Sequence, residues 1–226
     1  MIVVPAQLSL KGPFSDMDAI TERTLAVSGL DLEPVKRPSR EEAMEAVRTL
    51  IAWAGDDPRR EGVLDTPKRV VDAYGEWFEG YTADPGKELS RIFEDVQGYD
   101  DIVFLKDIEV ESHCEHHMAP FLGKAYVAYM PTNRVVGISK LARVVEIFAK
   151  RLQTQETMTQ QIADAICDSL KPAGVAILID AEHQCMTTRG VHHRNVSTIT
   201  TQFRGVFKTD TSLRDRFLSF VEMGKR

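Results

Sequence analysis

The stretch SKLARVVEIFAKRLQTQETMTQQIADAICDSL (139–170) carries the most regular apolar pattern in the chain, and it decides the fold class. Its first half repeats apolar residues at i, i+3, i+4, i+7, i+8 and i+11, which predicts an amphipathic helix capped by Ser139. Its second half predicts another helix over 154–170, which Pro172 and Gly174 end. Two successive helices are therefore expected in the middle of the chain.

Apolar residues on both sides of these helices change to a period near two. Strands are predicted over 102–112 and 123–130 before the helices, and over 175–187 and 196–207 after them. A closing helix is predicted over 212–223. The order β-β-α-α-β-β predicts an α+β fold, in which a mainly antiparallel sheet carries helices on one face.

The N-terminal part of the chain is predicted to be helical after a variable start. Three prolines and scattered charges mark residues 1–37 as a loose extension, with one short helix near 17–27. Ser39 and Glu42 form an S-x-x-E capping box that starts a helix, and Thr66 followed by proline starts a second one. We therefore divide the chain into an extension (1–37), a helical region (38–100) and a domain that carries the chemistry (101–226).

The composition is that of a globular protein, with 226 residues, 43% hydrophobic and 27% charged residues. It excludes disordered and collagen-like chains, and no apolar run reaches the roughly 18 residues that a membrane span needs. A net charge of -6 argues against general binding to nucleic acid or acidic membranes. Three cysteines and the lack of a secretory signal at the start predict a reducing, cytoplasmic location.

Two short segments combine the scarce histidines and cysteines, SHCEHHMAP (112–120) and AEHQC (181–185). Cys114 and His117 cannot share one face of a flat strand, but they converge in a turn. His183 and Cys185 are expected on a strand, pointing the same way. Thiolate and imidazole are preferred zinc ligands, and three of them leave a position open for water, which favours catalysis over a structural site.

The remaining histidines and the third cysteine are interpreted separately. With Cys114, His117 and Cys185 as zinc ligands, His116 and His183 are free to act as acid or base, because their ordinary pKa lies near neutrality. The other candidates are expected to have no such role: Cys167 as a small core residue, and His192 and His193 as solvated loop residues.

Basic and acidic residues near these segments suggest a nucleotide site. Lys140 and Arg143 share one face of a helix start with Ser139, which suits a phosphate, although a solvated helix start fits equally well. Arg189 follows Cys185 by four residues, so a phosphate held there would lie close to the metal. The carboxylate of Glu156, beside the Gln155 amide, can accept the two adjacent donors of a guanine edge, although acidic residues are ordinary at a helix N-terminus.

Four segments together resemble zinc-dependent GTP cyclohydrolase of type I. They are PRREGVLDTPKRV (58–70), CEHH (114–117), GISKLARVVEIFAKRLQTQETMTQQIA (137–163) and HQCMTTRG (183–190). The resemblance runs from about residue 40 to the C-terminus, with the motifs in the family's order. It implies the tunnelling fold, assembled as a homodecamer of two stacked pentamers with active sites between subunits.

The resemblance also implies an activity and residue roles. GTP and water would become 7,8-dihydroneopterin triphosphate and formate, a step toward pterins such as tetrahydrofolate. It assigns Cys114, His117 and Cys185 to zinc, His116 and His183 to proton transfer, Gln155 and Glu156 to guanine, Ser139, Lys140, Arg143 and Arg189 to ribose and triphosphate, and Arg69 to the triphosphate of a neighbouring subunit. Asp72 and Arg204 depart from residues common in the family.

Two other functions compete with this interpretation. A zinc-dependent nucleoside or base deaminase uses H-x-E with P-C-x-x-C. His113-Cys-Glu115 imitates the first half, but the sequence contains no C-x-x-C. A non-catalytic binding module on the same fold would use the metal for structure alone, and the histidines outside the ligand set argue against it.

Overall fold

The computed structural model describes residues 37–93 and 99–223, and the chain divides into two compact units between Thr82 and Ala83. The sequence-based boundary at residue 100 thus lies within the second unit. The predicted extension, with its short helix near 17–27, lies outside the described residues apart from Arg37. Within the described part of the chain, no helix is both long and apolar enough to cross a lipid bilayer.

The first unit is a helical hairpin with short 3-10 turns. Its elements are α2 (Arg40–Trp53), η2 (Glu61–Val63), α3 (Thr66–Trp77) and η3 (Glu79–Thr82). The predicted capping box is confirmed, because the backbone N–H of Glu42 donates to Ser39 Oγ and the N–H of Ser39 donates to Glu42 Oε2. The cap of α3 is Asp65 rather than Thr66, one residue earlier than predicted.

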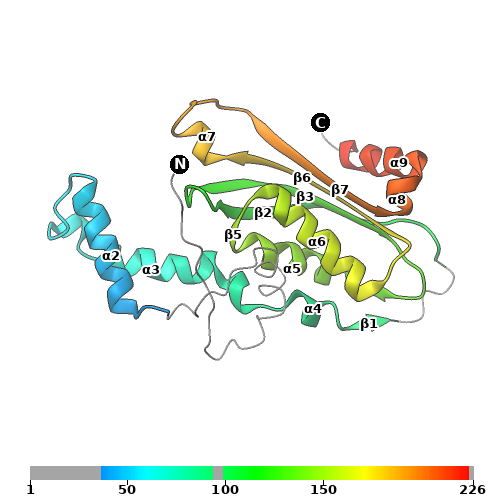
Figure 1. Ribbon diagram of the computed structural model, residues 1–226, viewed down its shortest axis with the longest axis horizontal. Helices are drawn as coiled ribbons and strands as arrows, with labels where there is room; N and C mark the ends of the chain where they lie inside the picture. The colour runs from blue at the N-terminus through cyan, green and yellow to red at the C-terminus, as the bar shows by residue number, and fades with distance from the viewer. Residues whose placement is uncertain (1–36, 94–98, 224–226) are drawn as a thin grey trace, which may run out of the picture. The chain divides into compact units, whose positions relative to one another are not determined.

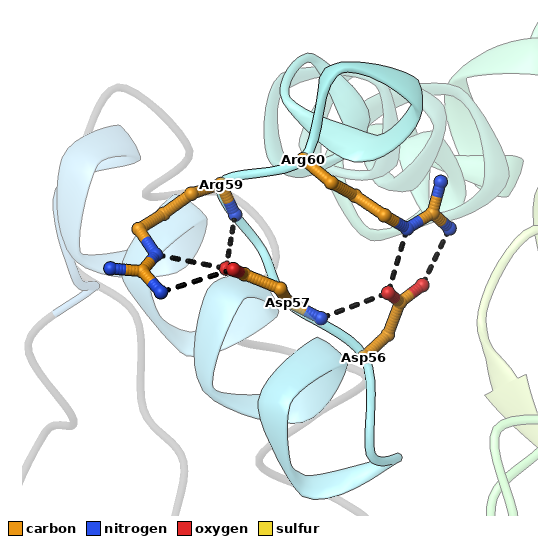
Figure 2. A network of polar contacts seen from close by, with 4 residues as sticks. All are labelled: Asp56, Asp57, Arg59 and Arg60. Atoms are coloured by element: carbon orange, nitrogen blue, oxygen red, sulfur yellow. Dashed lines mark hydrogen bonds and ion pairs between the residues drawn. The ribbon is translucent and has the colours of Figure 1, made fainter.

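Ion pairs within the connection between α2 and α3 hold its path (Figure 2). Arg60 donates to both carboxylate oxygens of Asp56, and Arg59 donates to both oxygens of Asp57. The N–H of Asp57 also donates to Asp56 Oδ1 at 2.9 Å. These side chains are largely exposed, so the network orders a polar loop and adds little to the free energy of unfolding.

The second unit is built on a five-stranded sheet in the order β5-β2-β3-β6-β7. Every neighbouring pair is antiparallel except β2 with β5, which is parallel. The strands are β2 (Val103–Cys114), β3 (Pro120–Met130), β5 (Leu152–Gln153), β6 (Gly174–His183) and β7 (Ser197–Gly205). A separate two-stranded sheet pairs β1 (Ile92–Phe93) with β4 (Val135–Val136), after the short helix α4 (Pro85–Glu88).

The two crossover helices cover one face of this sheet, as the sequence predicted (Figure 1). They are α5 (Ile138–Ala149) and α6 (Gln155–Leu170), and their apolar stripes meet alternate residues of the strands, including Val175, Ile177 and Ile179 of β6. Because side chains alternate along a strand, the intervening residues point to the other face. The α+β class is confirmed, and the long strands and crossover helices follow the expected sequence, but the structure adds the two-residue strands β4 before α5 and β5 between α5 and α6.

The expectation of helices on one face only is wrong. The terminal helices α8 (Val206–Thr209) and α9 (Thr211–Glu222) pack on the opposite face, against Ala176 and Leu178 of β6 (Figure 1). An antiparallel sheet that is apolar on both faces must have helices or other elements packed on each face. The sequence pattern of the last helix does not show on which face of the sheet this helix packs.

Truncation of Phe217 on α9 tests this second core. The side chain is fully buried and lies edge-on to Phe104, with ring centroids 5.7 Å apart. We expect Phe217→Ala to lower the free energy of unfolding by about 3–5 kcal/mol in chemical denaturation. Leu218→Ala, at an exposed neighbouring position, should change it by less than about 0.5 kcal/mol. Equal losses would contradict the packing of α9 on the sheet.

Candidate metal centre and nucleotide site

Cys114, His117 and Cys185 come together at one end of the sheet. One ligand atom from each residue lies within 4.8 Å of the others. Cys114 ends β2, and the chain turns back at once, because the N–H groups of His117 and Met118 both donate to the Cys114 carbonyl oxygen. Met118 takes a positive φ of 53° in this turn. The predicted convergence of the C-x-x-H pair in a turn is confirmed.

Cys185 reaches the cluster by a route that the sequence did not predict. The strand expected over 175–187 ends at His183, and Cys185 lies in the one-turn helix α7 (Gln184–Thr187). The reason is the neighbouring strand, since His183 pairs with Phe121 and β3 begins only one residue earlier, at a proline. With no further strand to pair with, the chain coils and carries the sulfur toward Cys114.

The chemistry of the three donors fits a cation. Burial raises the pKa of the Cys185 thiol, and the nearby Cys114 sulfur raises it further. Two thiolates so close together repel each other, and a divalent cation between them would remove that repulsion. Two sulfurs and one imidazole are also the ligand types that zinc prefers.

Arg189 and His116 stand beside the cluster. Arg189 Nη1 lies 2.7 Å from His117 Nε2, and His116 Nδ1 lies 3.6 Å from Cys114 Sγ. The His116 side chain is mostly exposed, so it can meet a ligand from solvent. The structure thus brings both residues to the place that the sequence predicted.

His183 is held on two sides. Its ring stacks on Phe121, with centroids 4.5 Å apart and planes 7° apart, and its Nε2 lies 2.8 Å from Gln155 Oε1. Burial lowers the pKa of His183, and the Glu156 carboxylate acts in the opposite direction. Glu156 is exposed in the first turn of α6.

The Gln155 side chain differs from its expected position on the guanine. It is 1% exposed, and its Nε2 donates to the backbone oxygens of Ile179 and Thr198. Its amide hydrogens are therefore used within the protein. Gln155 supports His183, and only Glu156 of the pair presents its side chain to solvent.

Ser139, Lys140 and Arg143 are not brought to the Cys114 cluster within one chain. They lie in the first turns of α5, whereas the end of this helix leads into β5, which pairs with the end of β2. A helix of 12 residues is about 18 Å long, and all three residues lie in its first half, away from the end that leads into β5. Ser139 is also not the helix cap, because that position belongs to Gly137.

The cationic side chains of Lys140 and Arg143 both pair with the carboxylate of Glu88. Glu88 Oε2 accepts from Lys140 Nζ at 2.7 Å and lies 3.4 Å from Arg143 Nη1. The Lys140 hydrogen bond is the main cause of the lowered pKa of Glu88. Arg69 lies in the first unit, on α3, where its guanidinium is 3.5 Å from the Asp65 carboxylate.

Comparisons with known proteins show the family of this chain. A family model described as GTP cyclohydrolase I matches residues 43–222. The chain is 75% identical over 187 residues to a protein of Hyphomonas neptunium named GTP cyclohydrolase 1, covering 83% of this chain and 91% of that protein. A protein of the same name from Maricaulis maris is 70% identical, over 82% of this chain and 91% of its own length. The chain belongs to the GTP cyclohydrolase I family.

Asp72 and Arg204, at which the resemblance suggested a departure from the family's pattern, both make defined contacts in the structure. Asp72 accepts hydrogen bonds from Arg40 of α2 and from Lys68, one turn away on α3, so it ties the hairpin together. Arg204 of β7 donates to Asp164 Oδ1 of α6 through Nε and Nη2, at 3.2 and 2.9 Å. Both residues serve contacts between neighbouring elements.

The structure also shows the residues that were expected to have no role at the site, and two residues near it that were not predicted. His192 and His193 are exposed in the loop before β7, as predicted, and Cys167 is partly buried against the core. Sequence reasoning missed Phe121 and Glu88. Phe121 directly follows the predicted turn, which was a usable signal, whereas nothing local connects Glu88 to the cations of α5.

Proposed function

We propose that this chain converts GTP and water into 7,8-dihydroneopterin triphosphate and formate, as a zinc-dependent GTP cyclohydrolase I. The observation that carries the proposal is the convergence of Cys114, His117 and Cys185, beside His116 and His183, in a chain of this family. The three donors would hold zinc and leave a position open for water. Zinc would supply a Lewis acid that lowers the pKa of this water toward neutrality.

The two histidines outside the ligand set would move the protons. We assign His183 to protonation of the imidazole-ring nitrogen of the purine while water attacks C8. His116, exposed beside Cys114, would assist ring opening and the later ring closure. Two hydrolytic C–N cleavages consume two water molecules and release C8 as formate, and closure of the pterin ring returns one. The net consumption is one water molecule per GTP.

The nucleotide would be held at both ends. The exposed Glu156 carboxylate would accept hydrogen bonds from N1–H and the 2-amino group of guanine. Arg189 would meet the triphosphate beside the metal. Ser139, Lys140 and Arg143 would bind ribose and phosphates of a nucleotide held at the cluster of a second chain, because they lie in the first half of α5, away from the helix end that leads to the cluster of their own chain. Arg69 would contribute to the triphosphate from a neighbouring subunit.

We propose a tunnelling fold assembled as a homodecamer of two stacked pentamers. In the five-stranded sheet, β7 is an edge strand, and β5 pairs with only the last two residues of β2. Such edges offer backbone groups to another copy of the chain. Three free thiols agree with a reducing compartment, so we place the enzyme in the cytoplasm, where it would supply pterins such as those of tetrahydrofolate synthesis.

Incubation of the zinc-loaded protein with GTP tests the activity. We expect formate and 7,8-dihydroneopterin triphosphate in equal amounts, measured by formate dehydrogenase coupling and by pterin fluorescence after oxidation. Release of ammonia without formate would instead identify the deaminase alternative. Binding of GTP without any product would identify the non-catalytic module, and either result would overturn the proposed function.

A further inference from the structure

The amide of Gln155 has only one possible orientation. Its Nε2 lies 3.0 Å from the carbonyl oxygen of Ile179 and 2.8 Å from that of Thr198. Carbonyl oxygens only accept hydrogen bonds, so the nitrogen must face them and the oxygen must face away. Because the side chain is 1% exposed, water cannot substitute for these partners. Oε1 is consequently turned toward His183 Nε2, at 2.8 Å.

This orientation fixes the hydrogen on the His183 ring. An amide oxygen has no hydrogen to donate, so His183 Nε2 must carry the proton of this bond. In the neutral ring the other nitrogen, Nδ1, is then the unprotonated one. Phe121, stacked with its plane 7° from that of the imidazole, sets the plane of the ring. Tautomer and plane are thus held by two different residues.

We propose that Gln155 is a positioning residue that selects the Nε2–H tautomer of His183 and leaves Nδ1 to exchange a proton with the purine. The inference rests on the proposed role of His183 in the reaction. The resemblance implied that the side chains of both Gln155 and Glu156 contact guanine. Under the present inference only the Glu156 side chain has that role. Gln155 then acts through His183 and does not touch the substrate with its amide.

Substitution of Gln155 by methionine separates these two roles. Gln155→Met keeps the length of the side chain but removes the acceptor for His183. A positioning role predicts that kcat falls by about 100-fold while KM and the dissociation constant for GTP stay unchanged. A guanine-binding role predicts weaker GTP binding instead. Weaker binding with an unchanged kcat would overturn the inference.

Thr159→Val is the matched control. Thr159 is 2% exposed, and its hydroxyl donates to the Gln155 carbonyl oxygen and lies 2.7 Å from Thr200 Oγ1. The substitution disturbs the same buried layer and leaves the acceptor of His183 in place. We expect a loss of stability with kcat preserved. If Thr159→Val lowered kcat as much as Gln155→Met, general damage to this layer would explain both, and the inference would fail.

A spectroscopic measurement tests the tautomer without any turnover. Solid-state 15N NMR of the zinc-loaded, histidine-labelled protein, above the pH range of imidazole protonation, distinguishes protonated from bare ring nitrogens. The His183 signals are assigned by their loss in His183→Asn. We expect a protonated Nε2 in the wild type and a mixture of tautomers in Gln155→Met. A protonated Nδ1 in the wild type would overturn the inference even if the proposed activity is present, and failure of GTP turnover alone would not.

Discussion

Cys185→Ala is expected to leave the purified protein without stoichiometric zinc and without formate release from GTP. Cys185 is one of three donors within 4.8 Å of one another, and its loss leaves only Cys114 and His117, which come from the same turn. Loss of a residue that merely supports a ligand costs 10–100-fold in metal affinity, so loss of a ligand should cost more than about 100-fold. Metal analysis of the purified variant and the GTP assay measure the two effects.

Cys167→Ala is the matched control for the loss of a thiol. Cys167 lies on α6, partly buried against the core and outside the three-donor cluster. This variant should retain one zinc ion per chain. Chelator treatment should inactivate the wild type, and added zinc should restore it, whereas added zinc should not restore Cys185→Ala. One zinc ion per chain in purified Cys185→Ala would remove Cys185 from the ligand set.

Features that depend on a few neighbouring residues were predictable from the sequence. The capping box of α2 and the stripes of α5 and α6 depend on spacing along one helix, and they appear where expected. The turn that joins Cys114 to His117 is equally local. In each case the interacting groups lie within a few residues of one another, so the pattern itself contains the geometry.

Features that depend on a partner distant in sequence were not predictable. No proline, glycine or asparagine separates the segment from Val175 to Ile179 from the following DAEHQC, and only the start of β3 at Pro120 shows why β6 stops at His183. The same limit applies to Gln155, whose amide is used by carbonyls from β6 and β7. Composition and spacing identify a side chain that can bind a guanine. They do not show that its hydrogen-bonding groups are already used by other parts of the protein.

The second large effect is expected at Glu156, now the remaining side-chain candidate for the guanine edge. Glu156→Gln keeps the shape of the side chain and removes the charge and one acceptor. Hydrogen bonds to a charged group contribute about 1.5–3 kcal/mol each, so two of them predict a loss in kcat/KM of at least about 100-fold. Asp168→Asn changes an exposed carboxylate at the other end of the same helix, ion-paired with Lys171, and should leave kcat/KM unchanged.

Inosine triphosphate shows whether the loss at Glu156 arises at the guanine edge. This nucleotide lacks the 2-amino group, so the wild type should prefer GTP strongly, whereas Glu156→Gln should barely distinguish the two. The comparison is needed because the Glu156 charge also raises the pKa of His183, and that effect would slow both nucleotides alike. A double-mutant cycle compares kcat/KM of the wild type and Glu156→Gln with GTP and with inosine triphosphate. The effect through the pKa of His183 is common to both nucleotides and cancels, so the cycle gives the coupling free energy between the Glu156 carboxylate and the 2-amino group. If Glu156→Gln kept the full preference for GTP, the carboxylate would not read the base, whatever its effect on the rate.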